Sequence, residues 1–349
     1  MLRREFIALA AVGGGGLLLP SGSRPLADSI LLSSDPLIAE FNLQSSFERY
    51  TPTPDFYVRN HFPIPQSGKD GGAAFLGIEG KVNQPVRLSA AELSRLKIKE
   101  IGAVLECSGN GTGPEALASN GLWEGWALAD VIGLARPTSV AKYMHLIGQD
   151  GFSRSVEISQ TGPDAMLATR LNHQPLTPEH GAPWRALFPG WYGMNSVKWL
   201  ERIVLSDTPV PSKTDEYLAK VGTPSGRSEY HPLPNVQVKS VVTYPAIGVI
   251  LHPGTVTVRG LAWSGTAKIA AVEVSTDNGA TWRVAELDPG GRYEWTLWKI
   301  TVKVPESGVL NIACKAIDDK GLEQPAQRDS NRLDGYANNT IERVRFLVE

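Results

Sequence analysis

Apolar and polar residues alternate with a period of two through the last third of the chain. Val256 and Val258 alternate with threonines, and Leu310, Ile312 and Cys314 fall on one face of a predicted strand. An STDNG run lies between two such segments, and its Asp-Asn-Gly core is typical of a β-hairpin turn. This pattern predicts several short strands that form an all-β sandwich of the immunoglobulin-like type.

The middle of the chain mixes helical and strand periods. Residues 89–93 predict the start of a helix, with a serine N-cap and Glu92 at the capping-box position. Residues 126–134 have helical spacing, whereas residues 142–147 and 196–205 have the apolar runs of strands. We therefore predict an α+β domain in this part of the chain.

A proline-rich stretch separates the two patterns. Residues 209–235 hold five prolines and few apolar residues, which predicts a connector that runs as an extended arm over the surface. The predicted boundaries are 28–235 for a catalytic domain with its connector and 236–349 for the sandwich.

The N-terminus has the features of an export signal. It begins MLRREFI and continues with a short, glycine-rich apolar run to Leu19 and a small residue near Ala27. The adjacent Arg3 and Arg4 resemble the twin-arginine signal, which exports proteins already folded around a cofactor. We therefore expect residues 1–27 to be removed and the mature protein to be periplasmic.

Composition narrows the class of function. The 349 residues carry a formal net charge of -2, so no basic surface for nucleic acid is indicated. No apolar run reaches the roughly 18 residues that a membrane-spanning helix needs. Two cysteines, Cys107 and Cys314, are too few for a disulfide scaffold, a cysteine-ligated iron–sulfur cluster or a CxxCH haem attachment. Any redox group must therefore be held by one or two thiolates at most.

Cys107 has the sequence context of a functional thiol. It ends an apolar run and begins a glycine-rich turn in residues 104–111, VLECSGNG. Such a turn lets the backbone approach a ligand closely, and the strand end directs the thiol toward that ligand. A single cysteine is more often a buried apolar residue, which is our interpretation of Cys314. The motifs below favour the functional interpretation for Cys107.

Five segments before the connector carry distinctive motifs, namely residues 57–65 (YVRNHFPIP), 106–111 (ECSGNG), 180–185 (HGAPWR), 189–193 (PGWYG) and 196–200 (SVKWL). In this order they resemble the sulfite oxidase family of molybdenum enzymes, which includes bacterial sulfite dehydrogenases and sulfane dehydrogenases. Residues 260–265 and 275–282 are similar to the dimerisation domain of that family. The resemblance extends from about residue 40 to the C-terminus.

The resemblance implies one molybdopterin cofactor that holds molybdenum. It makes Cys107 the protein ligand to the metal, a role that suits a soft thiolate. It places Arg59 beside the reacting group, where a guanidinium attracts an oxyanion. These two residues are the predicted catalytic residues. Arg185 and Lys198 are expected to contact the phosphate and the pterin. The predicted cofactor-binding residues are Tyr57, Val58, Arg59, Asn60, His61, Cys107, Asp150, His180, Arg185, Ser196, Val197 and Lys198.

Three positions depart from the sulfite oxidase pattern. Thr112 and, by approximate alignment, Thr296 stand where that family carries substrate-pocket arginines, and Thr169 stands in place of a pocket tyrosine. The predicted pocket is therefore less cationic than in a dedicated sulfite oxidase, which favours a larger, neutral or carrier-bound substrate. Residues 239–245 (KSVVTYP) also resemble bacterial relatives of the sulfane dehydrogenase type.

The resemblance implies an enzyme that oxidises sulfite or a related sulfur compound by oxygen-atom transfer. Because the chain has no haem motif, a separate c-type cytochrome is expected to accept the electrons, and the second domain is expected to form a homodimer. Two enzyme alternatives stay open, a sulfane dehydrogenase-like enzyme acting on carrier-bound sulfur and a reductase of an oxide or nitrate. The third alternative is a relative that binds the cofactor without turnover, against which Cys107 and Arg59 argue.

Overall fold

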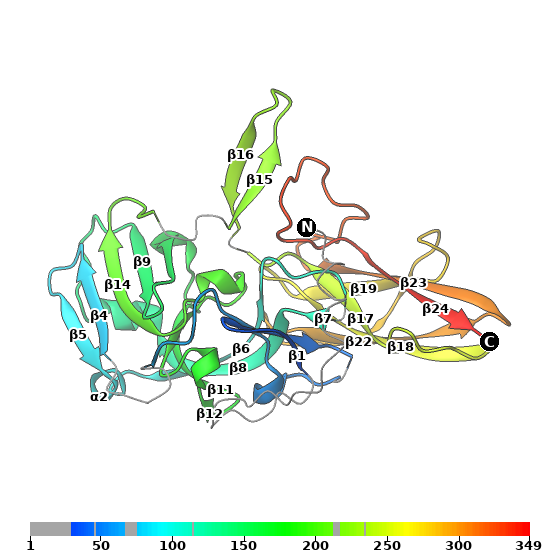
Figure 1. Cartoon of the computed structure of the whole chain (residues 1–349), viewed down its shortest axis with the longest axis horizontal. Helices are drawn as coiled ribbons and strands as arrows, with labels where there is room; N and C mark the ends of the chain where they lie inside the picture. Colours follow the sequence, from blue (N-terminus) through cyan, green and yellow to red (C-terminus); the bar gives the residue numbers. More distant parts are fainter. Residues whose placement is uncertain (1–28, 45–46, 67–74, 114, 212–216, 234) are drawn as a thin grey trace.

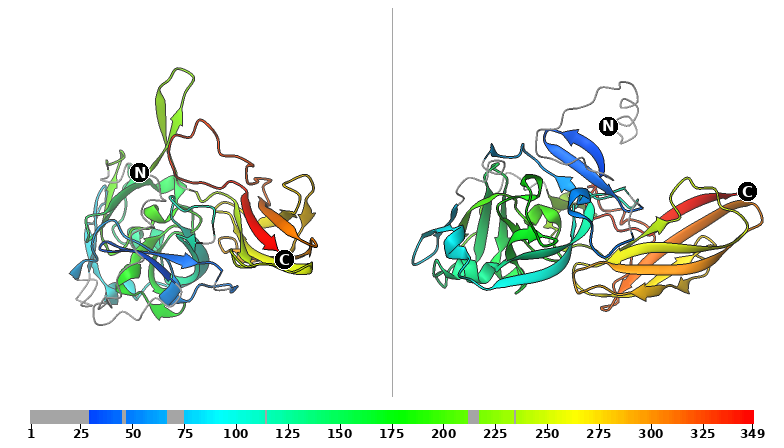
Figure 2. Two further views of the ribbon diagram at one scale, coloured as in Figure 1. Left: turned by 45° about the vertical axis from the view of Figure 1, so that its right-hand side comes forward. Right: turned by 90° about the horizontal axis from the view of Figure 1, so that it is seen from below.

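The computed structural model describes residues 29–44, 47–66, 75–113, 115–211, 217–233 and 235–349. The predicted signal segment, residues 1–27, lies outside this range. Two lobes lie side by side, and a β-hairpin projects from the region where they meet (Figures 1 and 2). None of the helices in the described residues combines the length and the hydrophobicity that a bilayer span needs.

The first lobe contains far more strand than helix, so the predicted α+β class holds only loosely. The helix expected at residues 89–93 is α2 (Ala90–Leu93), and its capping box is present. The Ser89 side chain accepts from the Glu92 N–H at 3.3 Å, and the Glu92 carboxylate accepts from the Ser89 N–H at 2.8 Å. The second predicted helix is reduced to α3 (Leu128–Gly133), because residues 126 and 127 complete a strand.

Three sheets build the first lobe. One has the order β10-β9-β14-β4-β5, with a parallel β4–β14 pair; another has the order β12-β11-β8-β6, with β13 on β11; the third joins β1, β2, β3 and β7. Their bounds are β1 (Ser29–Ser34), β2 (Leu37–Asn42), β3 (Val58–Arg59), β4 (Phe75–Gly80), β5 (Val86–Ser89), β6 (Ile98–Glu106), β7 (Glu115–Ala116), β8 (Ala118–Ala127), β9 (Tyr143–Gly148), β10 (Ser153–Glu157), β11 (Met166–Leu171), β12 (Gln174–Pro175), β13 (Arg185–Leu187) and β14 (Leu200–Ser206).

The two strands predicted in this lobe are present, with one shift. The strand expected at residues 142–147 is β9, whereas β14 begins only at Leu200. Residues 196–199 therefore precede the strand as irregular backbone. They follow the 3-10 turn η6 (Gly193–Asn195), where Ser196 N–H donates to Gly193 O at 3.0 Å. Because residues 196–199 do not pair in a sheet, they can line a cavity.

The hairpin of β6 and β8 positions Cys107. The two strands pair over nine residues, and Cys107 is the first residue after β6. The last four residues of β6 are buried, and the buried Trp123 of β8 donates its indole N–H to Ala103 O at 3.2 Å. The thiol thus stands at the end of a strand anchored in the core, as the sequence predicts.

The second lobe consists of two four-stranded antiparallel sheets around a common core. The orders are β17-β18-β22-β21 and β20-β19-β23-β24. Val258, Val272, Trp298, Ile312 and Phe346 are buried between the sheets, and Cys314 is fully buried among them. The finer immunoglobulin-like assignment and the predicted domain boundaries stay predictions. The bounds are β17 (Lys239–Tyr244), β18 (Gly254–Trp263), β19 (Ile269–Ser275), β20 (Arg283–Val284), β21 (Glu286–Asp288), β22 (Thr296–Val304), β23 (Gly308–Asp318) and β24 (Glu342–Val348).

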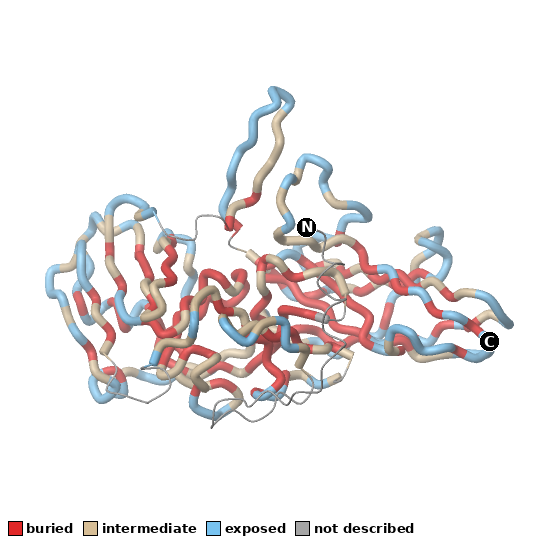
Figure 3. The backbone as a smooth tube through the Cα atoms, viewed as in Figure 1, coloured by how far each residue is buried: buried red, intermediate tan, exposed pale blue. Residues whose placement is uncertain are grey.

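The connector between the lobes is not a plain extended arm. It forms the projecting hairpin of β15 (Leu218–Gly222) and β16 (Ser228–Pro232), in which β16 is solvent-exposed and β15 is largely half-buried (Figures 1 and 3). The second lobe contacts this hairpin along β15, because Asp334 accepts from the Lys220 N–H at 2.7 Å and the Leu333 N–H donates to Lys220 O at 2.8 Å.

The two lobes share apolar packing at their junction. Val241, Leu261, Trp263 and Trp295 of the second lobe belong to the same buried cluster as the core of the first lobe. Buried backbone runs continuously through this region (Figure 3). The second lobe therefore packs directly behind the strand that carries Cys107.

Candidate active site

One cavity of the first lobe brings together ten of the twelve predicted site residues. It lies between β3, the end of β6, the turn after β9, and the segment before β14. The predicted residues that line it are Tyr57, Arg59, Asn60, His61, Cys107, Asp150, Arg185, Ser196, Val197 and Lys198. Segments separated by up to 141 positions in sequence thus converge on one space, although their roles as cofactor contacts stay predictions.

Val58 and His180 do not line this cavity. Val58 is fully buried on β3 and pairs with Ala39 of β2, so its side chain faces the core. His180 ends the 3-10 turn η5 (Pro178–His180) and packs edge-on against Phe56, with ring centroids 5.5 Å apart. Both residues support the cavity wall from behind rather than form its surface.

The cavity is lined by three cationic side chains and one carboxyl group. Lys198 donates to Asn60 Oδ1 and to Glu179 O, both at 2.7 Å, and Arg185 donates to Ser196 O at 2.7 Å. Burial, followed by the charge of Arg185, holds the pKa of Lys198 well below its usual value. Such a cluster favours an anionic ligand, because a negative charge would offset the mutual repulsion of the cations.

The two histidines of the site are neutral in the folded protein at neutral pH. Burial, aided by Arg59 and Lys198, lowers the pKa of His61 to about 4, and His61 hydrogen-bonds through Nε2 to the Tyr217 hydroxyl. Burial likewise lowers the pKa of His180 to about 3. The groups of the cavity that can carry positive charge at neutral pH are therefore Arg59, Arg185 and Lys198.

The cofactor-free protein is expected to lose stability in mild acid because of His180. Its folded-state pKa lies below the unfolded value, so the unfolded chain binds more protons below about pH 6.5 and the free energy of unfolding falls as pH falls toward 3. Full loss would amount to about 5 kcal/mol. Urea unfolding of wild type and His180→Gln between pH 7 and pH 5 checks this, since the variant should show a shallower fall. Equal slopes would contradict it.

Cys107 is a free, half-buried thiol at the cavity wall. The Cys107 N–H donates to Leu117 O at 2.8 Å, and Cys107 O accepts from the Asn110 N–H at 2.9 Å, so both flanks of its loop are fixed. Burial raises the pKa of this thiol, while the Gly109 N–H and Arg59 act in the opposite direction. Cys314 is fully buried in the other lobe, so Cys107 is the thiol that could hold a metal in this cavity.

The donor set fits a molybdopterin group. Asn60 Nδ2 and Arg185 Nε, from two residues that line the cavity, are buried, and no hydrogen-bond partner for them lies in the described part of the chain. A β-carbon at Gly193 would lie 2.7 Å from the Tyr57 hydroxyl, so the backbone is tightly packed at this wall. Unpaired donors beside cations suit a phosphorylated, hydrogen-bonding ring system, and a thiolate suits a soft metal.

The cavity also contains residues that the sequence analysis missed. Phe56, Phe152, Met194, Trp199 and Tyr217 contribute to its lining. Tyr217 comes from the connector and packs edge-on to His61 at a centroid distance of 5.3 Å. No local pattern points to it, because its role depends on where the connector crosses the first lobe.

The three threonines of the predicted substrate pocket do not line this cavity. Thr112, Thr169 and Thr296 are absent from the described residues that line the cavity. Thr169 lies on β11 with its hydroxyl 3.5 Å from Glu124 O, and Thr296 is buried on β22. Their location at a substrate pocket therefore stays a prediction.

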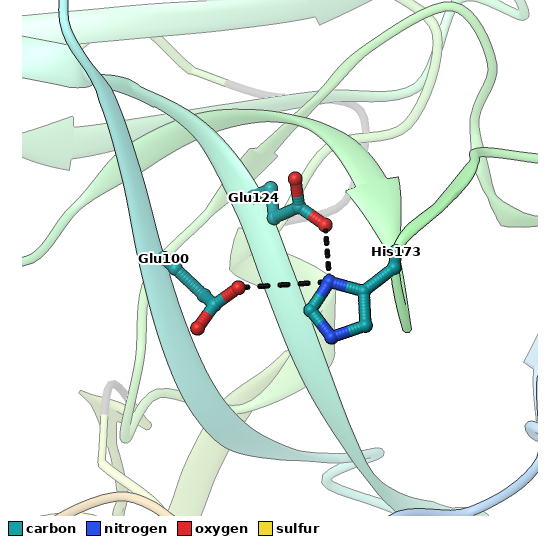
Figure 4. A group of neighbouring side chains, drawn as sticks. All are labelled: Glu100, Glu124 and His173. Atoms are coloured by element: carbon teal, nitrogen blue, oxygen red, sulfur yellow. Dashed lines mark hydrogen bonds and ion pairs between the residues drawn. The ribbon is translucent and has the colours of Figure 1, made fainter.

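A second titratable cluster lies outside the cavity. His173 Nδ1 is 3.0 Å from Glu124 and 3.7 Å from Glu100 (Figure 4). Arg170 Nε also contacts Glu124 at 3.3 Å, and His173 is 66% exposed. This arrangement is an exposed ion-pair network, in which an arginine already neutralises the most buried carboxylate.

Fold and cavity together define an oxidoreductase of the molybdopterin-binding class. A family model described as "Oxidoreductase molybdopterin binding domain" matches residues 61–214, and another described as "Mo-co oxidoreductase dimerisation domain" matches residues 231–349. The cofactor is therefore molybdenum held by molybdopterin.

The chain belongs to the sulfite oxidase family, which confirms the resemblance found in its motifs. It is 32% identical to the sulfite oxidase of Gallus gallus over 332 residues, covering 84% of this chain and 72% of that protein. The chain spans about two thirds of the mammalian sulfite oxidases, for example 65% of the Homo sapiens enzyme. The nitrate reductase of Emericella nidulans is 28% identical over 86% of this chain and 41% of its own length.

A solved structure matches both lobes. The crystal structure of the sulfane dehydrogenase SoxCD from Paracoccus pantotrophus has a TM-score of 0.83 and 25% sequence identity. The match covers 97% of this chain and 96% of that chain. The arrangement of the two lobes, and not only their separate folds, is thus shared with a member of the family.

Proposed function

We propose that this protein is a periplasmic molybdenum enzyme that oxidises sulfite or a related sulfur compound by oxygen-atom transfer. It would pass the electrons to an external c-type cytochrome. The observation that carries the proposal is the free thiol of Cys107 on the wall of a cavity lined by Arg59, Arg185 and Lys198. When bound, the molybdenum group supplies the oxygen-atom transfer and the redox change.

The chain's own residues then have four tasks. Cys107 would hold the metal, while Arg185 and Lys198 would bind the cofactor's anionic part. Arg59, whose Nη1 donates to Asn60 O, would attract and orient an anionic substrate. The cavity's aromatic residues would limit access of water to the reacting group.

A sulfane dehydrogenase-like activity is the second candidate. The near-complete match to SoxCD in both lobes supports it, as does the apolar part of the cavity lining, which includes Phe152, Met194 and Tyr217. A neutral or carrier-bound sulfur substrate would bind to this apolar part, and its binding would depend less on the cations than the binding of sulfite does. Because fungal nitrate reductases are among the relatives, nitrate reduction must also be tested.

Metal analysis with a dye-linked assay separates these activities. Purified protein would be assayed for molybdenum, then for oxidation of sulfite and of a carrier-bound sulfane, and for nitrate reduction with a reduced dye. Molybdenum with sulfite or sulfane oxidation supports the proposal, and nitrate reduction alone would redirect it. If the protein held molybdenum but showed no turnover, the remaining interpretation would be a relative that binds the cofactor without catalysis.

The predicted twin-arginine segment supports the proposed location. Fractionation of the native host would test it, with Arg3→Lys and Arg4→Lys together as the variant. We expect the wild type in the periplasm and the variant retained in the cytoplasm. A wild type that stays in the cytoplasm with an uncleaved N-terminus would contradict export.

The second lobe is expected to mediate a homodimer. Its family model describes a dimerisation domain, and it exposes Ile247, Val249, Ile250 and Leu347, each at least 45% accessible. Exposed apolar groups of this kind often mark an interface. Light scattering should show a dimer for wild type and a monomer for a Val249→Asp/Ile250→Asp variant. A monomeric wild type with molybdenum bound would contradict the expectation.

A further inference from the structure

A buried carboxylate stands next to the thiol of the site. Glu106 is 1% exposed and accepts three side-chain hydrogen bonds. Its Oε1 accepts from Lys239 Nζ at 2.5 Å and from Asn110 Nδ2 at 3.0 Å, and its Oε2 accepts from Trp263 Nε1 at 2.9 Å. Lys239 is 3% exposed, so both charges of this ion pair are removed from water.

Two of these donors come from the second lobe. Lys239 is the first residue of β17 and Trp263 is the last residue of β18, and these residues are register partners. Lys239 Nζ also donates to Gly111 O at 3.1 Å. One lysine of the second lobe therefore contacts both ends of the loop, at Glu106 and at Gly111.

A second group of contacts from the second lobe reaches the middle of the same loop. The Ala337 N–H donates to Ser108 O at 2.7 Å, and a β-carbon at Gly109 would lie 4.0 Å from Tyr336 and 3.9 Å from Cys107 Sγ. The second lobe thus fixes the loop before, after and at the residue that follows the thiol. Without the second lobe, Glu106 would keep the hydrogen bond from Asn110 but lose those from Lys239 and Trp263.

We propose that Glu106 and Lys239 are positioning residues that couple the docking of the second lobe to the placement of the Cys107 thiol in the cavity. This inference rests on the proposed function. A buried ion pair contributes little net stability against well-packed apolar residues, whereas loss of one partner leaves an uncompensated buried charge. The value of the pair therefore lies in the geometry it imposes on the loop.

The test is a double-mutant cycle on the holoprotein with Glu106→Gln, Lys239→Met and the combined variant. Thermal melting, molybdenum per chain and the electron paramagnetic resonance spectrum of the metal centre would be measured for each. We expect both single variants to lose thermal stability and to hold about tenfold less molybdenum. Loss of a residue that orients a metal ligand typically has an effect of this size on metal affinity. The combined variant should recover stability, because no unpaired charge remains, but keep low molybdenum and an altered spectrum.

Lys315→Met is the matched control. Lys315 pairs with Glu273 and Glu323, each at 3.1 Å, on the second lobe's other sheet. This variant should change stability and leave the spectrum and the molybdenum content as in wild type. A combined variant whose molybdenum content and spectrum recover together with its stability would overturn the positioning role and leave a purely structural pair.

A cofactor-independent measurement separates this inference from the proposed function. Alkylation of Cys107 in cofactor-free protein would be followed by mass spectrometry, with the buried Cys314 as internal reference. Faster alkylation of Cys107 in Lys239→Met and in the combined variant supports positioning, whether or not the wild type holds molybdenum. Unchanged alkylation would overturn it. Absence of molybdenum from the wild type would instead count against the proposed function alone.

Discussion

Cys107→Ser is expected to lower turnover by more than about a hundredfold, beyond the 10–100-fold that loss of an outer-shell partner costs. A serine oxygen is a poor match for a soft metal, and Cys107 is the thiol that reaches the cavity. The fold should persist, since the loop's backbone hydrogen bonds to Leu117 and Asn110 do not involve the sulfur. Turnover, molybdenum per chain and thermal melting would be measured together.

Cys314→Ser is the matched control for this variant. Cys314 lies in the core of the second lobe with its sulfur 3.8 Å from Glu342, a carboxyl group whose pKa burial raises to about 8. A serine hydroxyl can donate to that group, so the loss of stability should stay near 1 kcal/mol. Activity should match wild type. Near-normal turnover in Cys107→Ser, or its loss in Cys314→Ser, would refute the assignment of the metal ligand.

Arg59→Gln is expected to lower kcat/KM for sulfite about ten- to a hundredfold, mostly through KM. A charge-assisted bidentate contact between a guanidinium and an oxyanion contributes roughly 1.5–3 kcal/mol, and its loss would mainly weaken substrate binding. Wild-type activity on sulfite should also fall as salt rises, because screening weakens attraction into the cavity. Steady-state kinetics at low and high salt would measure both effects.

Arg202→Gln controls for the change in net charge. Arg202 is exposed on β14 and pairs with Glu79 at 3.2 Å outside the cavity, so kcat/KM should stay near the wild-type value. A carrier-bound substrate predicts a different result, slow sulfite turnover in wild type as well. Fast wild-type turnover that is indifferent to both Arg59→Gln and salt would show that Arg59 is a structural residue.

Local patterns in the sequence determined the elements that depend on neighbouring residues. The capping box of α2 forms as predicted because Ser89 and Glu92 are three residues apart. The turn predicted after β19 has positive φ angles of 61° at Asn278 and 93° at Gly279, as the Asn-Gly pair favours. The end of a buried strand at Cys107 followed from the same local logic. Ordered motifs then indicated the family, because each motif is short and contiguous.

The tertiary structure alone decided which residues meet. Val58 and His180 occur within or beside predicted motifs, yet pairing with β2 and packing against Phe56 direct their side chains away from the cavity. Tyr217 joins the lining from the connector. The Glu106–Lys239 pair spans 133 positions and depends on how the lobes dock. Local spacing cannot encode such contacts, because they arise from the free energy of packing distant segments together rather than from the conformational preferences of neighbouring residues.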